Sequence, residues 1–191
     1  TPSSDNGKLI PPRKLHATAW GYICPSETPE GQSVGVVKNL AMTCEITTKV
    51  SSKPIRELIK QFILDLKDFN IYLMNKNDFI KVFINGEWIG FTSEHRNLMN
   101  DFKYHRNMGK IHIHSSIYMN NNNRYIYIFT DGGRVIRPLL KVKNNKLIYN
   151  EYHKNKILNK EYNWRDLIIS IYKNKLSPIE YIDVYESQNI L

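Results

Sequence analysis

Several polar side chains between residues 13 and 39 are of types that suit contacts with phosphate or carboxylate groups. The planar guanidinium of Arg13 can bind two oxygens at once, as a phosphate or an acidic side chain offers them. Gln32, Lys38 and Asn39 supply donors to phosphate oxygens, a kind of contact that positions nucleic acid without reading its bases. The competing interpretations are that Arg13 is a surface residue beside a loop and that Lys38 is a solvated charge.

A carboxylate, Glu30, lies between Pro29 and Gly31. From the residues alone, the preferred interpretation is that Glu30 caps its own turn. Pro25, Pro29, Gly31 and Gly35 are best interpreted as the scaffold of this turn, because proline fixes φ and glycine permits tight turns.

The chain lacks the motifs of a self-sufficient active site, GxxxxGK[ST], GxSxG, HExxH and a DxDGD-type carboxylate cluster. His112 and His114 alternate on an expected strand face and could ligate a metal, but with no third ligand nearby exposed polar positions are the preferred interpretation. Cys24 and Cys44 form no CxxC pair, so neither a disulfide framework nor a zinc site is indicated, and a reducing compartment fits best.

The composition is that of a folded, basic chain of one or two domains. Of its 191 residues, 41% are hydrophobic, which is enough for a core, and the formal net charge is +9. Such a charge attracts polyanions, but the Lys and Asn residues of the second half equally suit an AT-biased genome. We expect no membrane span, because no apolar run approaches about 20 residues. The first residue, Thr1, indicates a fragment or a processed chain.

Proline and glycine are dense in residues 1–35, which predicts an ordered loop rather than long regular elements. We expect the packing of Leu15, Trp20, Tyr22 and Ile23 to hold it. One helix is then predicted, capped by Ser51 or Ser52 with Pro54 in its first turn. Its buried stripe, with spacings of three and four, would be Ile55, Leu58, Ile59, Phe62, Ile63, Leu66 and Phe69.

Hairpins and short helices are predicted beyond residue 79. Asn85-Gly86 supplies the two positive φ angles of a type I′ turn between strands 80–84 and 87–91. A helix over 93–106 should bury Leu98 and Phe102 and end at Gly109. Further predictions are a hairpin of 111–119 with 124–129, a hairpin of 135–142 with 146–149 around Asn144-Asn145, a helix over 164–172 capped by Asn163, and a strand over 179–184.

Residues 13–40 read RKLHATAWGYICPSETPEGQSVGVVKNL. This segment resembles the fork-region signature of second-largest (beta) subunits of multisubunit DNA-directed RNA polymerases, R-x-L-H-x-[ST]-x-W-G-x-x-C-P-x-E-T-P-E-G-x-x-x-G-L-x-K-N-L. VFINGEWIG at 82–90 and FTDGGRVIRPL at 129–139 are similar to later motifs of the same family, in the same order. Ala19 stands where the family usually has His, and Gly133 where it usually has Ala. The Trp20-Gly21 pair is similar to the eukaryotic, archaeal and large-DNA-virus branch.

The resemblance implies an α+β chain with a loop-rich fork segment followed by small external domains of mixed helices and β-hairpins. The implied division is the end of the fork at 1–50, external domain 1 at 51–140 and part of external domain 2 at 141–191. The assembled enzyme would be a nucleotidyltransferase, and we expect the isolated chain to be inactive, with no catalytic residue of its own. Arg134 and Arg137 would brace neighbouring polymerase domains.

The resemblance also implies roles for the polar residues of the fork. Arg13, Glu30 and Gln32 would lie at the active centre near the mobile trigger loop of the largest subunit, and Lys38 and Asn39 at the RNA–DNA hybrid backbone. The implied partners are the largest subunit, the rest of the second subunit, the DNA template, the hybrid and ribonucleoside triphosphates, with no membrane. Mg²⁺ of the assembled enzyme would be held mainly by the largest subunit and none by this chain.

Two other functions fit the sequence. A free-standing basic nucleic-acid-binding module would bind DNA or RNA with steep salt dependence. A structural interaction domain would have no contact near an active centre. The resemblance implies an intracellular place of action, either the nucleus or, for a viral protein, a cytoplasmic viral factory or virion.

Overall fold

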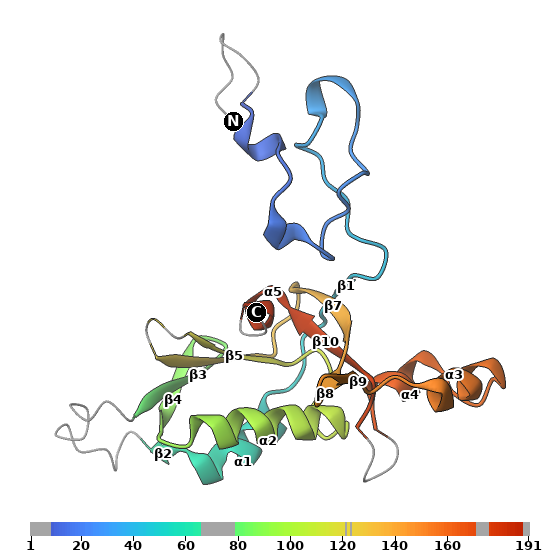
Figure 1. The fold of residues 1–191 in the computed structure, drawn as a ribbon. Helices are drawn as coiled ribbons and strands as arrows, with labels where there is room; N and C mark the ends of the chain where they lie inside the picture. The colour runs from blue at the N-terminus through green and yellow to red at the C-terminus, as the bar shows by residue number, and fades with distance from the viewer. Residues whose placement is uncertain (1–8, 66–78, 121, 123, 171–175, 189–191) are drawn as a thin grey trace. The chain divides into compact units, whose positions relative to one another are not determined.

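The computed structural model describes residues 9–65, 79–120, 122, 124–170 and 176–188. Its contacts divide the chain into two compact units, Thr1–Glu45 and Ile46–Leu191. The architecture is α+β, as predicted (Figure 1). The three-part division at residues 50 and 140 stays a prediction.

Loops and single turns make up the described part of the first unit. Three 3-10 turns, η1 (Pro11–Arg13), η2 (Ala17–Ala19) and η3 (Gly31–Ser33), are joined by extended chain, and Ile23 pairs with Leu40 in an isolated antiparallel bridge. The density of Pro and Gly accounts for this irregularity.

The predicted packing of the first unit is wrong for two of its four residues. Tyr22 is 4% exposed and Ile23 is partly buried, but Leu15 and Trp20 are 73% and 78% exposed. The reason is geometric, because a chain this short with only single turns has no second layer to cover these side chains.

A five-stranded sheet organises the second unit, in the order β2-β4-β3-β6-β5. Its hairpin of β3 (Ile80–Ile84) and β4 (Glu87–Thr92) turns at Asn85 and Gly86, with φ of 50° and 85°, which confirms the predicted type I′ geometry. β6 (Tyr125–Phe129) pairs in parallel with β3 and antiparallel with β5 (Ser116–Asn120), so the second predicted hairpin is also confirmed, with a later start to its first strand.

Two helices cover one face of this sheet, α1 (Lys53–Ile59) and α2 (His95–Asn107) (Figure 1). Leu98 and Phe102 are fully buried and Gly109 has a φ of 71°, as predicted. The core between helices and sheet consists of Ile55, Ile59, Ile80, Val82, Ile84, Leu98, Phe102, Ile111, Ile117, Ile126 and Ile128.

The single long helix predicted from residue 55 to residue 69 is wrong. Helix α1 ends at Ile59, η4 (Lys60–Phe62) adds one 3-10 turn, and β2 (Leu64–Asp65) then pairs with β4. A Cβ at Gly90 would lie 2.4 Å from the carbonyl oxygen of Leu64, so glycine at that position admits the strand. Sheet pairing therefore replaces the helix, while Leu66 and Phe69 lie outside the described residues.

A second sheet has the order β1-β7-β10, formed by β1 (Glu45–Ile46), β7 (Val135–Leu140) and β10 (Ile179–Asp183). The third predicted hairpin is confirmed only at its tip, where β8 (Val142–Lys143) pairs with β9 (Lys146–Leu147). β7 pairs instead with β10, antiparallel from Ile136 opposite Asp183 to Leu140 opposite Ile179. Strand β10, which was predicted over 179–184, forms a longer ladder of hydrogen bonds with β7 than the strand that follows β7 directly in the sequence would.

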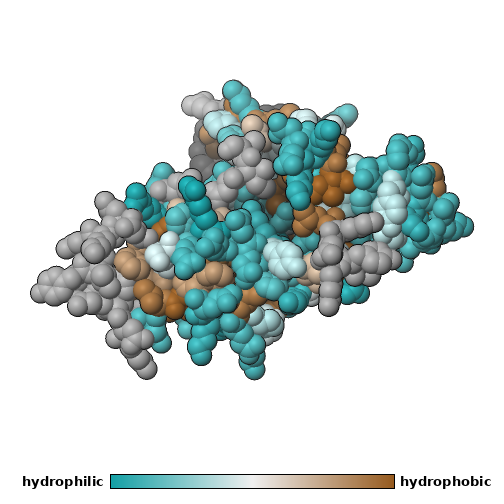
Figure 2. Space-filling model, turned by 60° about the horizontal axis from the view of Figure 1, so that its bottom comes forward, coloured by the Kyte–Doolittle hydropathy of each residue, from teal (hydrophilic) through white to brown (hydrophobic). Residues whose placement is uncertain are grey.

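Three further helices complete the described chain. α3 (Glu151–Leu158), which was not predicted, begins at Asn150 in a reciprocal cap with His153. α4 (Trp164–Ile168) begins at the predicted cap Asn163 but ends earlier than predicted, and α5 (Val184–Ser187) follows β10. A second core packs under α4 and consists of Ile136, Leu167, Ile168, Ile179 and Tyr181. The face turned forward in Figure 2 mixes hydrophilic and hydrophobic side chains.

A buried charge network ties β10 and α5 to α2 and β5. Arg106, whose side chain is 4% exposed, donates through Nη1 to both carboxylate oxygens of Glu186, at 2.9 and 3.1 Å, and also binds Glu180. Glu186 Oε1 accepts from the backbone N–H of Ile117 at 3.0 Å. Burial raises the pKa of Glu186, against the opposing attraction of Arg106. The carboxylate therefore depends on Arg106 to remain charged.

A second arginine extends this network. Arg134 Nη1 donates to Asp183 Oδ2 at 3.0 Å and to Ser116 Oγ at 2.6 Å, and Ser116 Oγ donates to the same carboxylate. Its Nε binds Asp131 at 2.9 Å. Arg134 thus braces elements of its own unit, whereas a bracing role between polymerase domains, for Arg134 as for Arg137, stays a prediction.

We expect Arg106→Met to destabilise the chain by about 3–5 kcal/mol at neutral pH, because it leaves the carboxyl group of Glu186 buried without its charged partner. Arg96→Met is the matched control, since Arg96 is exposed on the same helix, and it should change the free energy of unfolding by less than about 0.5 kcal/mol. Urea unfolding followed by circular dichroism measures both. Equal stability of the two variants would contradict the assigned role of Arg106.

Candidate functional site

The polar side chains predicted to contact the active centre or a nucleic-acid backbone belong to the first unit, where several of them bind the backbone of their own loop. Arg13, at the end of η1, donates from Nη1 to the carbonyl oxygens of Gln32 and Val34, both at 2.7 Å. One guanidinium thus joins the N-terminal turn to the residues of η3.

Lys38 and Asn39 make contacts of the same kind. The ammonium of Lys38 donates to the carbonyl oxygen of Pro12 at 2.9 Å and to that of Gly35. The side-chain amide of Asn39 donates to the carbonyl oxygen of Glu27 at 3.2 Å. Predicted as contacts to a nucleic-acid backbone, these side chains have partners within the loop.

Thr28 closes the loop from inside. Its hydroxyl accepts from the backbone N–H of Gly35 at 2.8 Å and donates to the carbonyl oxygen of Val37 at 3.0 Å. Gly35 has a φ of 72°, and a Cβ there would lie 2.4 Å from the carbonyl oxygen of Arg13. Glycine is therefore required at this position.

Two of the predicted site residues are exposed at η3. Glu30 is exposed at the start of η3 and makes no capping hydrogen bond, so the interpretation that it caps its own turn is wrong. Gln32 is also exposed, although its carbonyl is held by Arg13. Pro25 and Pro29 are exposed beside the loop, and Gly31 has a φ of 80° with open space around it.

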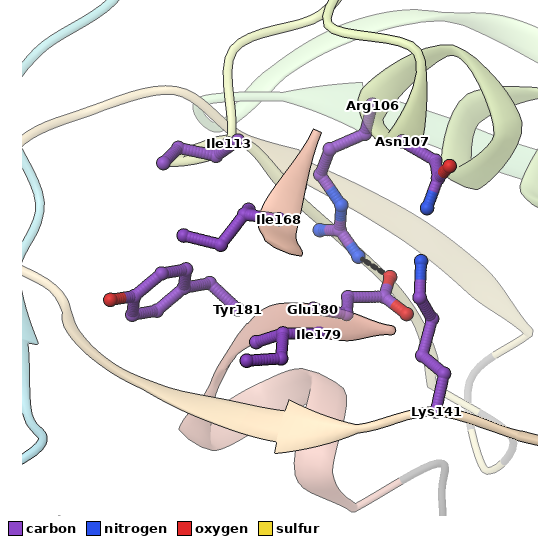
Figure 3. A pocket seen from close by; sticks show the side chains of 8 residues that line it. All are labelled: Arg106, Asn107, Ile113, Lys141, Ile168, Ile179, Glu180 and Tyr181. Carbon is purple, nitrogen blue, oxygen red and sulfur yellow. Dashed lines mark hydrogen bonds and ion pairs between the residues drawn. The ribbon is translucent and has the colours of Figure 1, made fainter. Parts of the chain in front are cut away.

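A small cavity of the second unit lies between α2, β7, α4 and β10 (Figure 3). Arg106, Asn107, Lys141 and Glu180 line its polar side, and the amine of Lys141 donates to Ser177 Oγ at 2.9 Å. The cavity measures about 10 Å³, which is room for one water molecule. It is too small to be a substrate site.

His112 and His114 each accept a hydrogen bond from a nearby backbone N–H. Nδ1 of His114 accepts from the backbone N–H of Thr48 at 3.1 Å, and Nδ1 of His112 accepts from the backbone N–H of His114 at 3.1 Å. Burial lowers the pKa of His112, and the charge of Arg165 adds to the effect. Among the described residues, no group of three or more His, Cys, Asp or Glu is arranged to hold a metal ion.

Sequence reasoning overlooked Thr28 and the charge network around Arg106. A signal for Arg106 existed, because it follows Leu98 and Phe102 at intervals of four and so continues the buried stripe of α2. A buried arginine needs acidic partners, which Glu180 and Glu186 supply. Thr28 gave no comparable signal, since its partners are backbone groups.

Two models of known protein families match the chain. That for RNA polymerase Rpb2, domain 3, matches residues 2–46, and that for RNA polymerase Rpb2, domain 4, matches residues 82–143. The DNA-directed RNA polymerase III subunit RPC2 of Drosophila melanogaster is 34% identical over 185 residues, 95% of this chain and 16% of that protein.

Other relatives agree. The DNA-directed RNA polymerase II subunit RPB2 of Encephalitozoon cuniculi is 35% identical over 98% of this chain and 16% of its own length. DNA-directed RNA polymerase subunit 2 of Acanthamoeba polyphaga mimivirus is 35% identical over 100% of this chain and 16% of its own length.

The chain belongs to the family of second-largest subunits of DNA-directed RNA polymerases. It spans about one sixth of the length of these relatives, 16% in each case. The match to the second-subunit domain 3 ends at residue 46, next to the boundary along the chain between the two compact units, at residues 45 and 46. No helix in the described parts is both long and apolar enough to cross a membrane.

The charge of Lys141 should make stability depend on pH. Burial lowers the pKa of Lys141 to about 8, with the charge of Arg106 acting in the same direction and that of Glu180 opposing it. Below pH 8 the fold bears the cost of a buried ammonium. Between pH 8 and the unfolded pKa the unfolded chain binds more protons, so this cost disappears as the pH rises.

We therefore expect Lys141→Met to raise the free energy of unfolding by about 1–3 kcal/mol at pH 7. The advantage over the unmodified chain should shrink steadily as the pH is raised toward 10. Lys143→Met is the control, because Lys143 is exposed in the adjacent strand β8. Denaturant unfolding at several pH values checks this, and a pH-independent difference would refute the assignment.

Proposed function

We propose that the chain is a piece of the second-largest subunit of a DNA-directed RNA polymerase and contributes part of the active-centre cleft during template-directed RNA synthesis. Its first unit would be the fork loop, placed near the trigger loop of the largest subunit and the RNA–DNA hybrid. The second unit would be the outer scaffold that carries it. The assembled enzyme would bind the DNA template and ribonucleoside triphosphates.

The observation that carries this proposal is that most large hydrophobic side chains of the first unit are exposed rather than buried. Tyr22 is its one large hydrophobic side chain that is buried among the described residues. Many others are exposed, namely Leu9, Ile10, Leu15, Trp20, Val34, Val36, Val37, Leu40 and Met42. Apolar exposure on this scale indicates a surface that packs on other protein. The rest of the second subunit and the largest subunit would supply that protein.

The free-standing nucleic-acid-binding module is the weaker alternative. Two of the cations that would form its phosphate-binding face, Arg13 and Lys38, donate to carbonyl oxygens of their own loop. Mg²⁺ of the assembled enzyme would be held mainly by the largest subunit, as the family resemblance implies. Action in the nucleus, or in a viral factory or virion, is part of the same proposal.

Within the proposed cleft, Glu30 and Gln32 are the side chains free to reach a moving partner, because the loop holds its backbone and leaves them outside. A carboxylate that accepts a hydrogen bond from the closing trigger loop would favour the closed state, which gates nucleotide addition. Chemistry itself would remain with the largest subunit.

We expect Glu30→Gln, in a polymerase assembled with this chain as part of its second subunit, to lower the maximal elongation rate about three- to tenfold, because one charge-assisted hydrogen bond is weakened. The apparent affinity for nucleotide should change less. Single-nucleotide addition followed by rapid quench measures both quantities.

Glu151→Gln supplies the control, because Glu151 is an exposed carboxylate of α3 in the second unit. It should leave the rate unchanged. Unchanged elongation and fidelity in Glu30→Gln would favour a purely structural interaction domain over the proposed function.

A further inference from the structure

We infer that Arg13 and Lys38 are positioning residues, which fix the Glu30 turn by binding its backbone carbonyls and do not contact nucleic acid. The Glu30 turn is defined here as residues 30–35. Its geometry stands on this chain alone, whereas its effect on elongation rests on the proposed function.

The two cations hold the Glu30 turn at three of its carbonyls. Arg13 binds those of Gln32 and Val34, both at 2.7 Å, and Lys38 binds that of Gly35. Lys38 also binds the carbonyl of Pro12, at 2.9 Å, directly before Arg13. The turn and η1 are thus joined by two charged side chains.

These bonds engage part of the donors of each cation and direct them to the loop backbone. The two hydrogens of Arg13 Nη1 go to the two carbonyls, which leaves Nε and Nη2 outside these bonds, and two of the three ammonium hydrogens of Lys38 are used. A phosphate that drew either side chain away from the loop would break bonds that satisfy backbone carbonyls.

Besides the two cations, Thr28 supports the turn by accepting from the backbone N–H of Gly35 at 2.8 Å, and Val34 N–H donates to the carbonyl oxygen of Gly31 within it. The turn's own apolar side chain, Val34, is 40% exposed, so core packing does not hold it. Gly35 comes so close to the backbone of Arg13 that a Cβ would lie 2.4 Å from the carbonyl oxygen. This close approach places Arg13 at a fixed distance from the turn. Side-chain bonds and a glycine contact thus replace a core.

The consequence is that Arg13 and Lys38 act on any partner through Glu30. The turn begins at Glu30, whose φ is −77°, and continues directly into the residues that Arg13 holds. Loss of either cation would let the backbone after Glu30 adopt several conformations. The carboxylate of Glu30 would then no longer occupy a single position. A group that is correctly placed only part of the time contributes less to a closed state.

The first test is structural and needs no activity. Hydrogen exchange over residues 27–37 is followed by mass spectrometry in the assembled polymerase that carries Arg13→Met, Lys38→Met or the control Lys14→Met. Lys14 loses the same charge and is exposed next to Arg13. We expect exchange to accelerate about tenfold or more in the first two variants and to be restored by Lys38→Arg, which keeps two donors. Unchanged exchange in both variants would overturn the inference.

The second test separates positioning from phosphate contact. Retention of a DNA–RNA scaffold is measured against salt concentration, and a lost phosphate contact lowers the log–log slope by about one. We expect Lys38→Met to leave the slope unchanged while lowering the maximal elongation rate about three- to tenfold. A slope reduced by about one, with exchange unaffected, would make Lys38 a phosphate contact and overturn the inference.

A double-variant cycle with Glu30→Gln completes the design. If Arg13 and Lys38 act through Glu30, their rate defects should nearly vanish in the Glu30→Gln background. Fully additive defects would overturn that part of the inference. If Glu30→Gln alone has no effect, the proposed function fails, and the exchange measurement still decides whether the two cations hold the turn.

Discussion

A loop without a core must find partners for its backbone carbonyls among its own side chains, and this requirement shapes the first unit. Unpaired carbonyls are costly wherever water is excluded, and a loop that packs inside a larger assembly loses its water. Thr28, Arg13 and Lys38 each bind two backbone groups, and Asn39 binds one. The polar residues that resemble a functional motif thus form much of the framework, and Glu30 and Gln32 are left to face outward.

In the second unit, charged side chains have a different role from those of the first unit. Two hydrophobic cores hold its sheets and helices, so its charged side chains are free to join elements that are distant in sequence. Arg106 and Arg134 bind Glu186 and Asp183 from β10 and α5 and fasten the end of the described chain to the large sheet. A rigid scaffold of this kind suits a loop that has little stability of its own.

Local signals in the sequence predicted local structure well. Asn85-Gly86 specified its hairpin, because the two positive φ angles of the turn allow few other residues, and Gly109 ended α2 for the same reason. The prediction of a long helix after Pro54 was wrong. The apolar spacing continues past the end of α1, but the chain there forms strand β2, which pairs with β4 beside Gly90. The paired residues of β7 and β10 are 39 to 47 positions apart in the sequence, a separation at which sequence patterns give no register.

The candidate site was predictable in its location but not in its internal contacts. The motif of residues 13–40 indicated which residues belong to the candidate site. The sequence does not distinguish an Arg13 or Lys38 that binds phosphate from one that binds a backbone carbonyl distant in sequence. Leu15 and Trp20 were expected inside for their hydrophobicity alone, although the chain offers nothing to cover them. The covering protein is by our account another part of the polymerase, which the 191 residues do not contain.

Amide hydrogen exchange of the isolated chain, compared with the same chain inside an assembled polymerase, tests this account most directly. We predict that residues 80–129 are protected in both states, because they have their own core, and that residues 9–45 exchange rapidly in the isolated chain and slowly in the enzyme. Equal and strong protection of residues 9–45 in both states would show that the first unit stands alone and would contradict the account.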